Sequence, residues 1–231
     1  MEFEGLTIIS YNVGGISLFD IHGLIETLEM EQPWGVLLLQ EFGSFKEIPV
    51  DYIEHYVIRT STSDVGFSPR YGPDGALIKP KRAAKSVGII VHARHIPYVD
   101  VSSVIMADRC IKLDLCIGKL HYRFISCHLD PYGDMEVLEQ QYKHLNRLLS
   151  DVSMDDRVVI GMDSQCTLSH RKLGESPALI GPFLLRVELN HRSSLRRDML
   201  SNFSHRNDLA FANTLGDSSE LFWAPHVGRL P

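Results

Sequence analysis

The clearest indication of the fold is the stretch Gly35-Val-Leu-Leu-Leu-Gln-Glu41, in which a glutamate follows an apolar run. Two other stretches have the same form, Leu6-Thr-Ile-Ile-Ser-Tyr-Asn12 and Arg157-Val-Val-Ile-Gly-Met-Asp-Ser-Gln165. A short apolar run indicates a strand buried on both faces, as in the interior of a layered α/β domain. The last side chains of such strands meet at one edge of the sheet. We therefore expect Asn12, Glu41 and Asp163 to gather oxygen ligands of the kind that bind Mg²⁺.

Composition and length indicate one globular domain. The chain has 231 residues, of which 44% are hydrophobic and 23% are charged, ordinary values for a globular protein. No stretch reaches the roughly 18 apolar residues that a membrane span requires, so no membrane partner is expected. The four cysteines form no CxxC pair and no signal peptide precedes them. This pattern favours reduced thiols in an intracellular protein.

Basic residues are concentrated in two stretches, although the net charge is −6. Residues 76–99 contain five lysines and arginines and no acid, and residues 186–206 contain five arginines against two acids. An acidic chain with local basic stretches fits an enzyme that binds a polyanion. Solvent-exposed loops and helix faces explain the same pattern equally well.

Hydrophobic periodicity predicts the order of the elements. Asp134 is a good N-cap for the clearest helix, and Gly118-Lys119 is predicted to join two strands as a hairpin. The long strands, the hairpin and the helices between strand pairs indicate an α/β fold in which a mixed β-sandwich is flanked by helices. Strands are predicted over 6–12, 35–40, 54–59, 86–92, 110–117, 120–127 and 157–162, and helices over 20–31, 135–151 and 194–207.

Five side chains at the predicted strand ends can carry chemistry. Glu41 needs a partner because a buried carboxylate destabilises a fold, and Asn12 can orient it or ligate a metal through its amide oxygen. Asp163 can deprotonate water, while Gln165 can donate its amide N–H to a phosphate oxygen. His128 can hydrogen-bond a phosphoryl oxygen or protonate a leaving group. The alternative for each is a structural role at a turn or strand end.

In this order the segments resemble the endonuclease/exonuclease/phosphatase superfamily, which includes DNase I-like and apurinic-site nucleases. Ile9-Ser-Tyr-Asn-Val13 is similar to the first strand with its metal-site Asn, and Leu39-Gln-Glu41 is similar to the segment with the metal-binding Glu. Ser86-Val-Gly-Ile-Ile-Val91 resembles the central strand. Cys127-His-Leu129 resembles the Thr-His-Leu segment, whose His acts on the scissile phosphate. Val159-Ile-Gly-Met-Asp-Ser-Gln165 stands where the family has Gly-Asp-x-Asn.

Residues 190–214 also resemble the endonucleases of non-LTR retrotransposons. The resemblance implies a DNase I-like four-layer fold and a Mg²⁺ cofactor, with Mn²⁺ as the alternative. It implies DNA as the partner, a longer polyprotein with a reverse transcriptase, and a place in the nucleus. On this interpretation Glu41 and Asn12 bind the metal, and Asp163, His128 and Gln165 are catalytic. The basic residues expected to contact the DNA backbone are Arg82, Lys85, Arg192, Arg196 and Arg197.

Two departures from the family pattern leave alternatives open. Gln165 replaces the family Asn, so this side chain is one methylene group longer. A position error near 1 Å can cost about 100-fold in rate. Family members continue past the equivalent of Pro231 with a Ser-Asp-His segment, so we expect residues 1–231 to be a single domain that is incomplete at its C-terminus and lacks its last strands. The alternatives are a non-catalytic nucleic-acid-binding remnant, and a phosphatase or a nucleotide or phospholipid phosphodiesterase.

Overall fold

The computed structural model describes residues 6–13, 18–31, 33–41, 55–59, 70–71, 77–78, 87–107, 109–131, 133–166, 168, 172 and 191–211. The predicted DNA contacts Arg82 and Lys85 lie outside these residues. The chain divides into two compact units, residues 1–131 with 151–164, and residues 132–150 with 165–231. That 1–231 form a single domain stays a prediction. Among the described helices, none is long and apolar enough to span a membrane.

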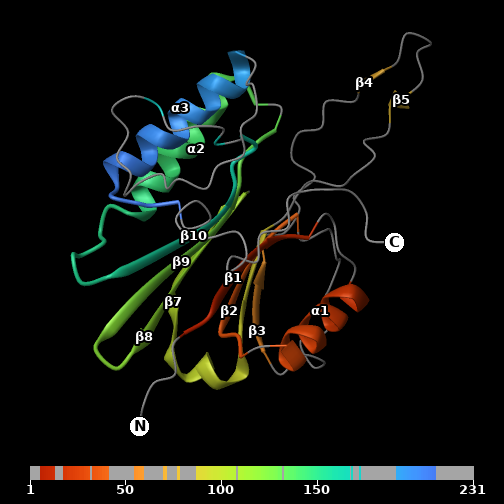
Figure 1. The fold of residues 1–231 in the computed structure, drawn as a ribbon, viewed down its shortest axis with the longest axis vertical. Helices are drawn as coiled ribbons and strands as arrows, with labels where there is room; N and C mark the ends of the chain where they lie inside the picture. Colours follow the sequence, from red (N-terminus) through yellow and green to blue (C-terminus); the bar gives the residue numbers. More distant parts are fainter. Residues whose placement is uncertain are drawn as a thin grey trace. The chain divides into compact units, whose positions relative to one another are not determined.

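The first sheet contains the strand that the sequence indicated most clearly. Every residue of β2 is buried, in agreement with the expectation for an apolar run in a layered fold. β2 pairs in parallel with β1 and antiparallel with β6, and β6 pairs antiparallel with β3. The sheet order is β1-β2-β6-β3, with β1 at Ile8–Asn12, β2 at Val36–Gln40, β3 at Tyr56–Arg59 and β6 at Val87–Val91. Figure 1 labels β1, β2 and β3 of this sheet.

The second sheet repeats this arrangement with one parallel pair, β9 with β10, and two antiparallel pairs. The predicted hairpin is confirmed, because β8 and β9 are joined at Gly118, whose φ of 62° suits a residue without a Cβ. The order is β10-β9-β8-β7, with β7 at Val99–Ala107, β8 at Cys110–Ile117, β9 at Leu120–His128 and β10 at Arg157–Asp163.

The described residues also contain three shorter elements. A 3₁₀ helix, η2, covers Ala93–Tyr98 and leads directly into β7. β4 (Arg70–Tyr71) and β5 (Leu77–Ile78) form a separate two-stranded antiparallel pair. None of these elements, nor β7, was predicted from the sequence.

The two four-stranded sheets pack face to face around one apolar core. Val36 and Leu38 of β2 point into this core, where they meet Ile111 and Leu113 of β8 and Phe124 of β9. The alternate residues of β2 point the other way, since successive side chains of a strand face opposite sides. They pack against helix α1 (Leu18–Glu31). The mixed α/β sandwich predicted from the sequence is confirmed.

The second unit contains the helices α2 (Met135–Leu148) and α3 (His191–Arg206). Asp134 caps α2 as predicted, because its carboxylate accepts the N–H of Val137 at 3.0 Å. The rings of Tyr142 and Phe203 lie 5.2 Å apart and join the two helices. Compared with the predictions over 135–151 and 194–207, α2 ends three residues before its predicted end and α3 begins three residues before its predicted start.

Candidate metal centre

Four strand ends converge at one edge of the sandwich. Asn12 is the last residue of β1 and Glu41 directly follows β2, its parallel neighbour. His128 and Asp163 are the last residues of β9 and β10, and they are paired in register. Because each parallel pair brings two carboxyl ends together, two strands of each sheet deliver a polar side chain to the same place.

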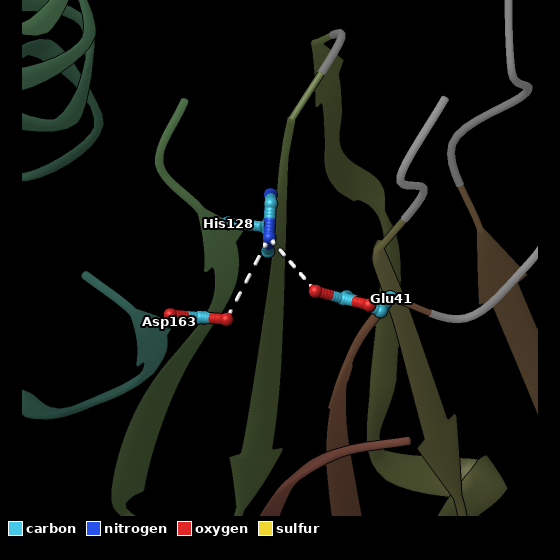
Figure 2. Close-up of side chains that lie close together, drawn as sticks. All are labelled: Glu41, His128 and Asp163. Atoms are coloured by element: carbon cyan, nitrogen blue, oxygen red, sulfur yellow. Dashed lines mark ion pairs between the residues drawn. The ribbon is translucent and has the colours of Figure 1, made fainter. Parts of the chain in front are cut away.

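The side chains of Glu41, His128 and Asp163 face one another in Figure 2. The Nε2 atom of His128 lies 3.6 Å from Oε1 of Glu41 and 3.6 Å from Oδ2 of Asp163. Asn12 donates its Nδ2–H to the same Asp163 oxygen at 2.5 Å. Within the described residues, this is the one group of His, Cys, Asp and Glu side chains whose ligand atoms all lie within 4.8 Å of one another.

The burial of these groups makes a cation an effective partner. The His128 side chain is 0% exposed, that of Glu41 7% and that of Asp163 19%. Two ionised carboxylates within 4.8 Å repel each other by roughly 3 kcal/mol at an effective dielectric constant near 20. Buried charges are found paired or bound to metals for this reason. The donor set, two carboxylates and a nearby amide, therefore fits a hard divalent cation.

The backbone at two predicted site residues is strained. Glu41 has a φ of 55° and Gln165 a φ of 53°, in the left-handed region that residues with a Cβ seldom adopt. Each such residue costs on the order of 1–3 kcal/mol, and strain of this kind concentrates at functional sites. At Glu41 the left-handed turn ends β2 and follows directly on the buried Gln40.

A buried polar layer beneath the site holds the two sheets at a short distance. The Nε2 atom of Gln40 in β2 contacts Oγ of Ser126 in β9 at 3.3 Å and Oγ of Ser10 in β1 at 3.4 Å. Ser126 donates to the carbonyl of Leu39 at 2.9 Å. Gly161 of β10 lies against this layer, since a Cβ there would stand 2.5 Å from the Ser10 oxygen. The sequence alone does not single out these supporting residues, because a Gln inside an apolar run carries no signal by itself.

Two neighbours of His128 complete its surroundings. Nη1 of Arg109 lies 3.0 Å from Nδ1 of His128, and Nη2 of Arg109 lies 3.3 Å from Oδ2 of Asp130. A hydrogen bond with the thiol of Cys110, together with burial, raises the pKa of the Cys127 thiol well above its usual value. Cys127 is therefore a protonated, unreactive packing residue, although it precedes the candidate catalytic histidine.

The remaining predicted residues are placed differently. Gln165 belongs to the second unit, so its phosphate-binding role stays a prediction. Arg192 and Arg196 of α3 both donate to the carbonyl of Gly133, at 2.9 and 3.0 Å. Arg196 and Arg197 are buried, which is typical of arginines that pack rather than contact a ligand. Their contact with DNA stays a prediction. It has less support than the predicted contact of Arg192, which is exposed.

Two solved structures share the fold of this chain. An AP endonuclease, LMAP from Leishmania major, aligns with a TM-score of 0.53 at 11% identity, covering 87% of this chain and 65% of that one. A 3′ phosphatase, NExo from Neisseria, bound to a product DNA hairpin, aligns with a TM-score of 0.50 at 13% identity. This alignment covers 87% of this chain and 70% of that one. The endonuclease domain of TRAS1, a telomere-specific non-LTR retrotransposon, aligns with a TM-score of 0.48 at 13% identity. The alignment covers 87% of this chain and 71% of that one.

These two alignments show the fold, the DNase I-like mixed α/β sandwich that the motifs in the sequence predicted. The chain spans 65% to 71% of the length of these three solved chains. No protein-family model matches the sequence, and neither does any curated protein.

Proposed function

We propose that this chain is a Mg²⁺-dependent phosphodiesterase domain that hydrolyses the DNA backbone, as a retroelement-type endonuclease does. The observation that supports it most is the meeting of Glu41, His128 and Asp163, from strands far apart in the sequence, within 4.8 Å. A buried carboxylate and a half-buried one beside a buried histidine at the strand ends are a poor structural solution. They are a good solution for binding a cation and moving a proton.

Glu41 and Asn12 are the residues proposed to hold the cation. The amide N–H of Asn12 is directed to Asp163, so its carbonyl oxygen is the atom suited to ligation. Oxygen donors of this kind favour Mg²⁺, with Mn²⁺ as the alternative. Bound there, the cation would neutralise charge on the scissile phosphate.

Asp163 is proposed as the general base. The hydrogen bond from Asn12 fixes the orientation of its carboxylate, and its 19% exposure gives water access to it. Its second oxygen can then accept a proton from an attacking water. His128 is proposed to donate its Nε2–H to a phosphoryl oxygen, and Gln165 to steady another.

Contacts with the DNA backbone are proposed for the basic residues of the two basic stretches. Arg82, Lys85 and Arg192 have the stronger claim, because Arg196 and Arg197 are buried. Such contacts would raise affinity without reading base sequence. The nuclear location and the polyprotein context belong to the same proposal.

A nicking assay on supercoiled plasmid tests the proposal. Wild-type protein should nick in Mg²⁺ and not in EDTA, and Glu41→Ala should lower the rate by about 100-fold or more, because the cation loses its buried carboxylate. Glu139→Ala removes an exposed carboxylate of α2 and should nick at the wild-type rate. If Glu41→Ala nicks as fast as wild type, the site is not the one proposed.

The two alternative functions give different results in the same experiment. Retention of DNA on a salt-sensitive column without nicking by either protein would identify a binding remnant, since phosphate contacts alone depend on salt. Hydrolysis of a small phosphodiester that duplex DNA does not inhibit would identify a small-molecule enzyme. Inhibition by duplex DNA supports the endonuclease.

A further inference from the structure

We propose that Arg109 is a positioning residue that fixes the His128 ring with its Nε2–H, rather than a lone pair, directed at the two carboxylates. The consequence for catalysis rests on the proposed function, whereas the consequence for the ring does not. This orientation of the ring leaves the cation to the oxygen donors and His128 to bind the phosphate.

The backbone holds Arg109 opposite His128. Arg109 directly precedes β8, and the N–H of His128 donates to the Arg109 carbonyl at 3.0 Å. The two Cα atoms therefore keep their separation whatever the side chains do. From this position the guanidinium reaches Nδ1 of His128 with one nitrogen, at 3.0 Å, and Oδ2 of Asp130 with another, at 3.3 Å.

The fork of the guanidinium explains why an arginine occupies this position. Its planar N–H groups can bind two partners at once, and the ion pair with Asp130 stops it from rotating away from His128. Asp130 thus acts on the arginine and only indirectly on the ring.

The direction of the Arg109–His128 hydrogen bond follows from chemistry. A guanidinium has donors and no acceptor, so Nδ1 must accept, and in the neutral ring the proton sits on Nε2. Nε2 is the atom that faces Glu41 and Asp163 at 3.6 Å each (Figure 2). A nitrogen that carries a proton cannot ligate a cation. The same N–H can donate to a phosphoryl oxygen.

A rival interpretation is that Arg109 contacts the substrate phosphate itself. Its side chain is 28% exposed, so burial does not exclude a direct contact. The two roles differ in what they change: a positioning residue affects the chemical step, whereas a phosphate contact affects affinity and its salt dependence.

Nitrogen NMR of the metal-free protein tests the ring assignment without any activity. In the neutral form of the ring, wild type should show Nδ1 of His128 as the unprotonated nitrogen and Nε2 as the protonated one, with His128→Gln identifying the signals. Arg109→Met should lose this preference, and Arg147→Met, which removes an exposed arginine of α2, should retain it. A proton on Nδ1 in wild type would overturn the proposal. An unchanged preference in Arg109→Met would do so as well, because the carboxylates would then suffice.

Steady-state nicking kinetics test the consequence. Arg109→Met should lower kcat by about 10- to 100-fold, the usual effect of misplacing a reacting group, and leave KM unchanged. Arg109→Lys keeps the charge but offers one nitrogen in place of the two that reach His128 and Asp130, so its kcat should fall between those of wild type and Arg109→Met. If Arg109→Met instead raised KM at wild-type kcat, Arg109 would be a phosphate contact. The slope of log affinity for DNA against log salt concentration would then also be smaller by about one. Should no protein nick at all, the NMR result still decides the ring assignment.

Discussion

At the scale of single residues, Glu41 combines features that each destabilise the metal-free fold. Its carboxylate is buried, it lies near the carboxylate of Asp163, and its backbone is left-handed. Destabilising features of this kind concentrate at functional sites. His128 relieves part of the repulsion, because its single Nε2–H lies equally far from both acids.

Replacing this charge should therefore stabilise the protein in the absence of metal. Glu41→Gln keeps the shape and removes the charge, so the free energy of unfolding in EDTA should rise by roughly 1–2 kcal/mol. The rise in Tm that Mg²⁺ gives to wild type should disappear in the variant. Urea unfolding in EDTA and thermal unfolding in Mg²⁺ measure the two effects.

Glu139→Gln is the matched control, since Glu139 is exposed on α2. It should change the free energy of unfolding by less than about 0.5 kcal/mol and keep the response to Mg²⁺. A Glu41→Gln protein less stable than wild type in EDTA would mean that the carboxylate serves mainly as a hydrogen-bond partner of His128.

The residues that sequence reasoning brought to this site share one property. Asn12, Glu41, His128 and Asp163 each stand at the end of an apolar run, so their convergence follows from the rule that strand ends meet. Arg109 stands before a strand, and its role depends on the register with His128. The register cannot be read from one strand alone, and for that reason the arginine was not predicted.

At the scale of secondary-structure elements, β8 and β9 carry a buried network of charges on one face. Lys112 and Asp114 alternate with residues of the sandwich core and therefore face the opposite side of the sheet. Arg123 of β9 donates to both oxygens of Asp114, at 3.0 and 2.9 Å, and also to Asp151. Burial lowers the pKa of Arg123, but the hydrogen bonds with Asp114 and Asp151 raise it above its usual value overall.

Asp114→Asn should be one of the most destabilising single substitutions in these strands. It leaves Lys112 and Arg123, both buried, without the carboxylate they share, and breaking a buried ion pair costs about 3–5 kcal/mol. Asp155→Asn, in an exposed turn, should cost less than about 0.5 kcal/mol. Urea unfolding measures both. A loss below about 1 kcal/mol for Asp114→Asn would show that water reaches the network.

The same strands show where periodicity succeeds and where it fails. Alternation identified β8 and β9 to within one residue, yet it would place Lys112 and Asp114 in solvent, because a polar residue at every second position normally marks an exposed face. β7 was overlooked for another reason. Its register with β8 shifts between Asp100 and Ile105, and such an irregularity interrupts the alternation on which strand prediction depends.

At the scale of the whole sandwich, the site exists only because two sheets built from separate parts of the chain approach closely at one edge. Glu41 and Asn12 come from the first sheet, and His128 and Asp163 from the second. The sequence could predict each strand end, but the distance between sheets depends on packing that no single stretch contains. In the described residues, Gly161 is a point where that distance is set directly.

Gly161 stands where the backbone of β10 approaches both β1 and β2. A Cβ at this position would lie 2.5 Å from Oγ of Ser10 and 2.6 Å from Cβ of Leu38. The Ser10 hydroxyl can rotate away, but the Cβ of Leu38 is fixed to the backbone of β2. β10 must therefore move away if the residue gains a methyl group. Asp163 lies two residues further along this strand, so the movement would be transmitted to the candidate base.

Gly161→Ala should consequently reduce both stability and activity. Overpacking of this kind costs roughly 1–3 kcal/mol, and a displacement of Asp163 near 1 Å costs about 100-fold in nicking rate. Gly23→Ala is the opposite case, because a Cβ at this position in α1 meets no atom within 4 Å and helix propensity should add about 0.5–1 kcal/mol. Urea unfolding and plasmid nicking of both variants distinguish the effect of a steric clash from the effect of replacing glycine by alanine as such. If Gly161→Ala were as stable and as active as wild type, the two sheets would have to lie further apart beneath the site than these distances imply, and the close approach of the two carboxylates would lose its structural cause.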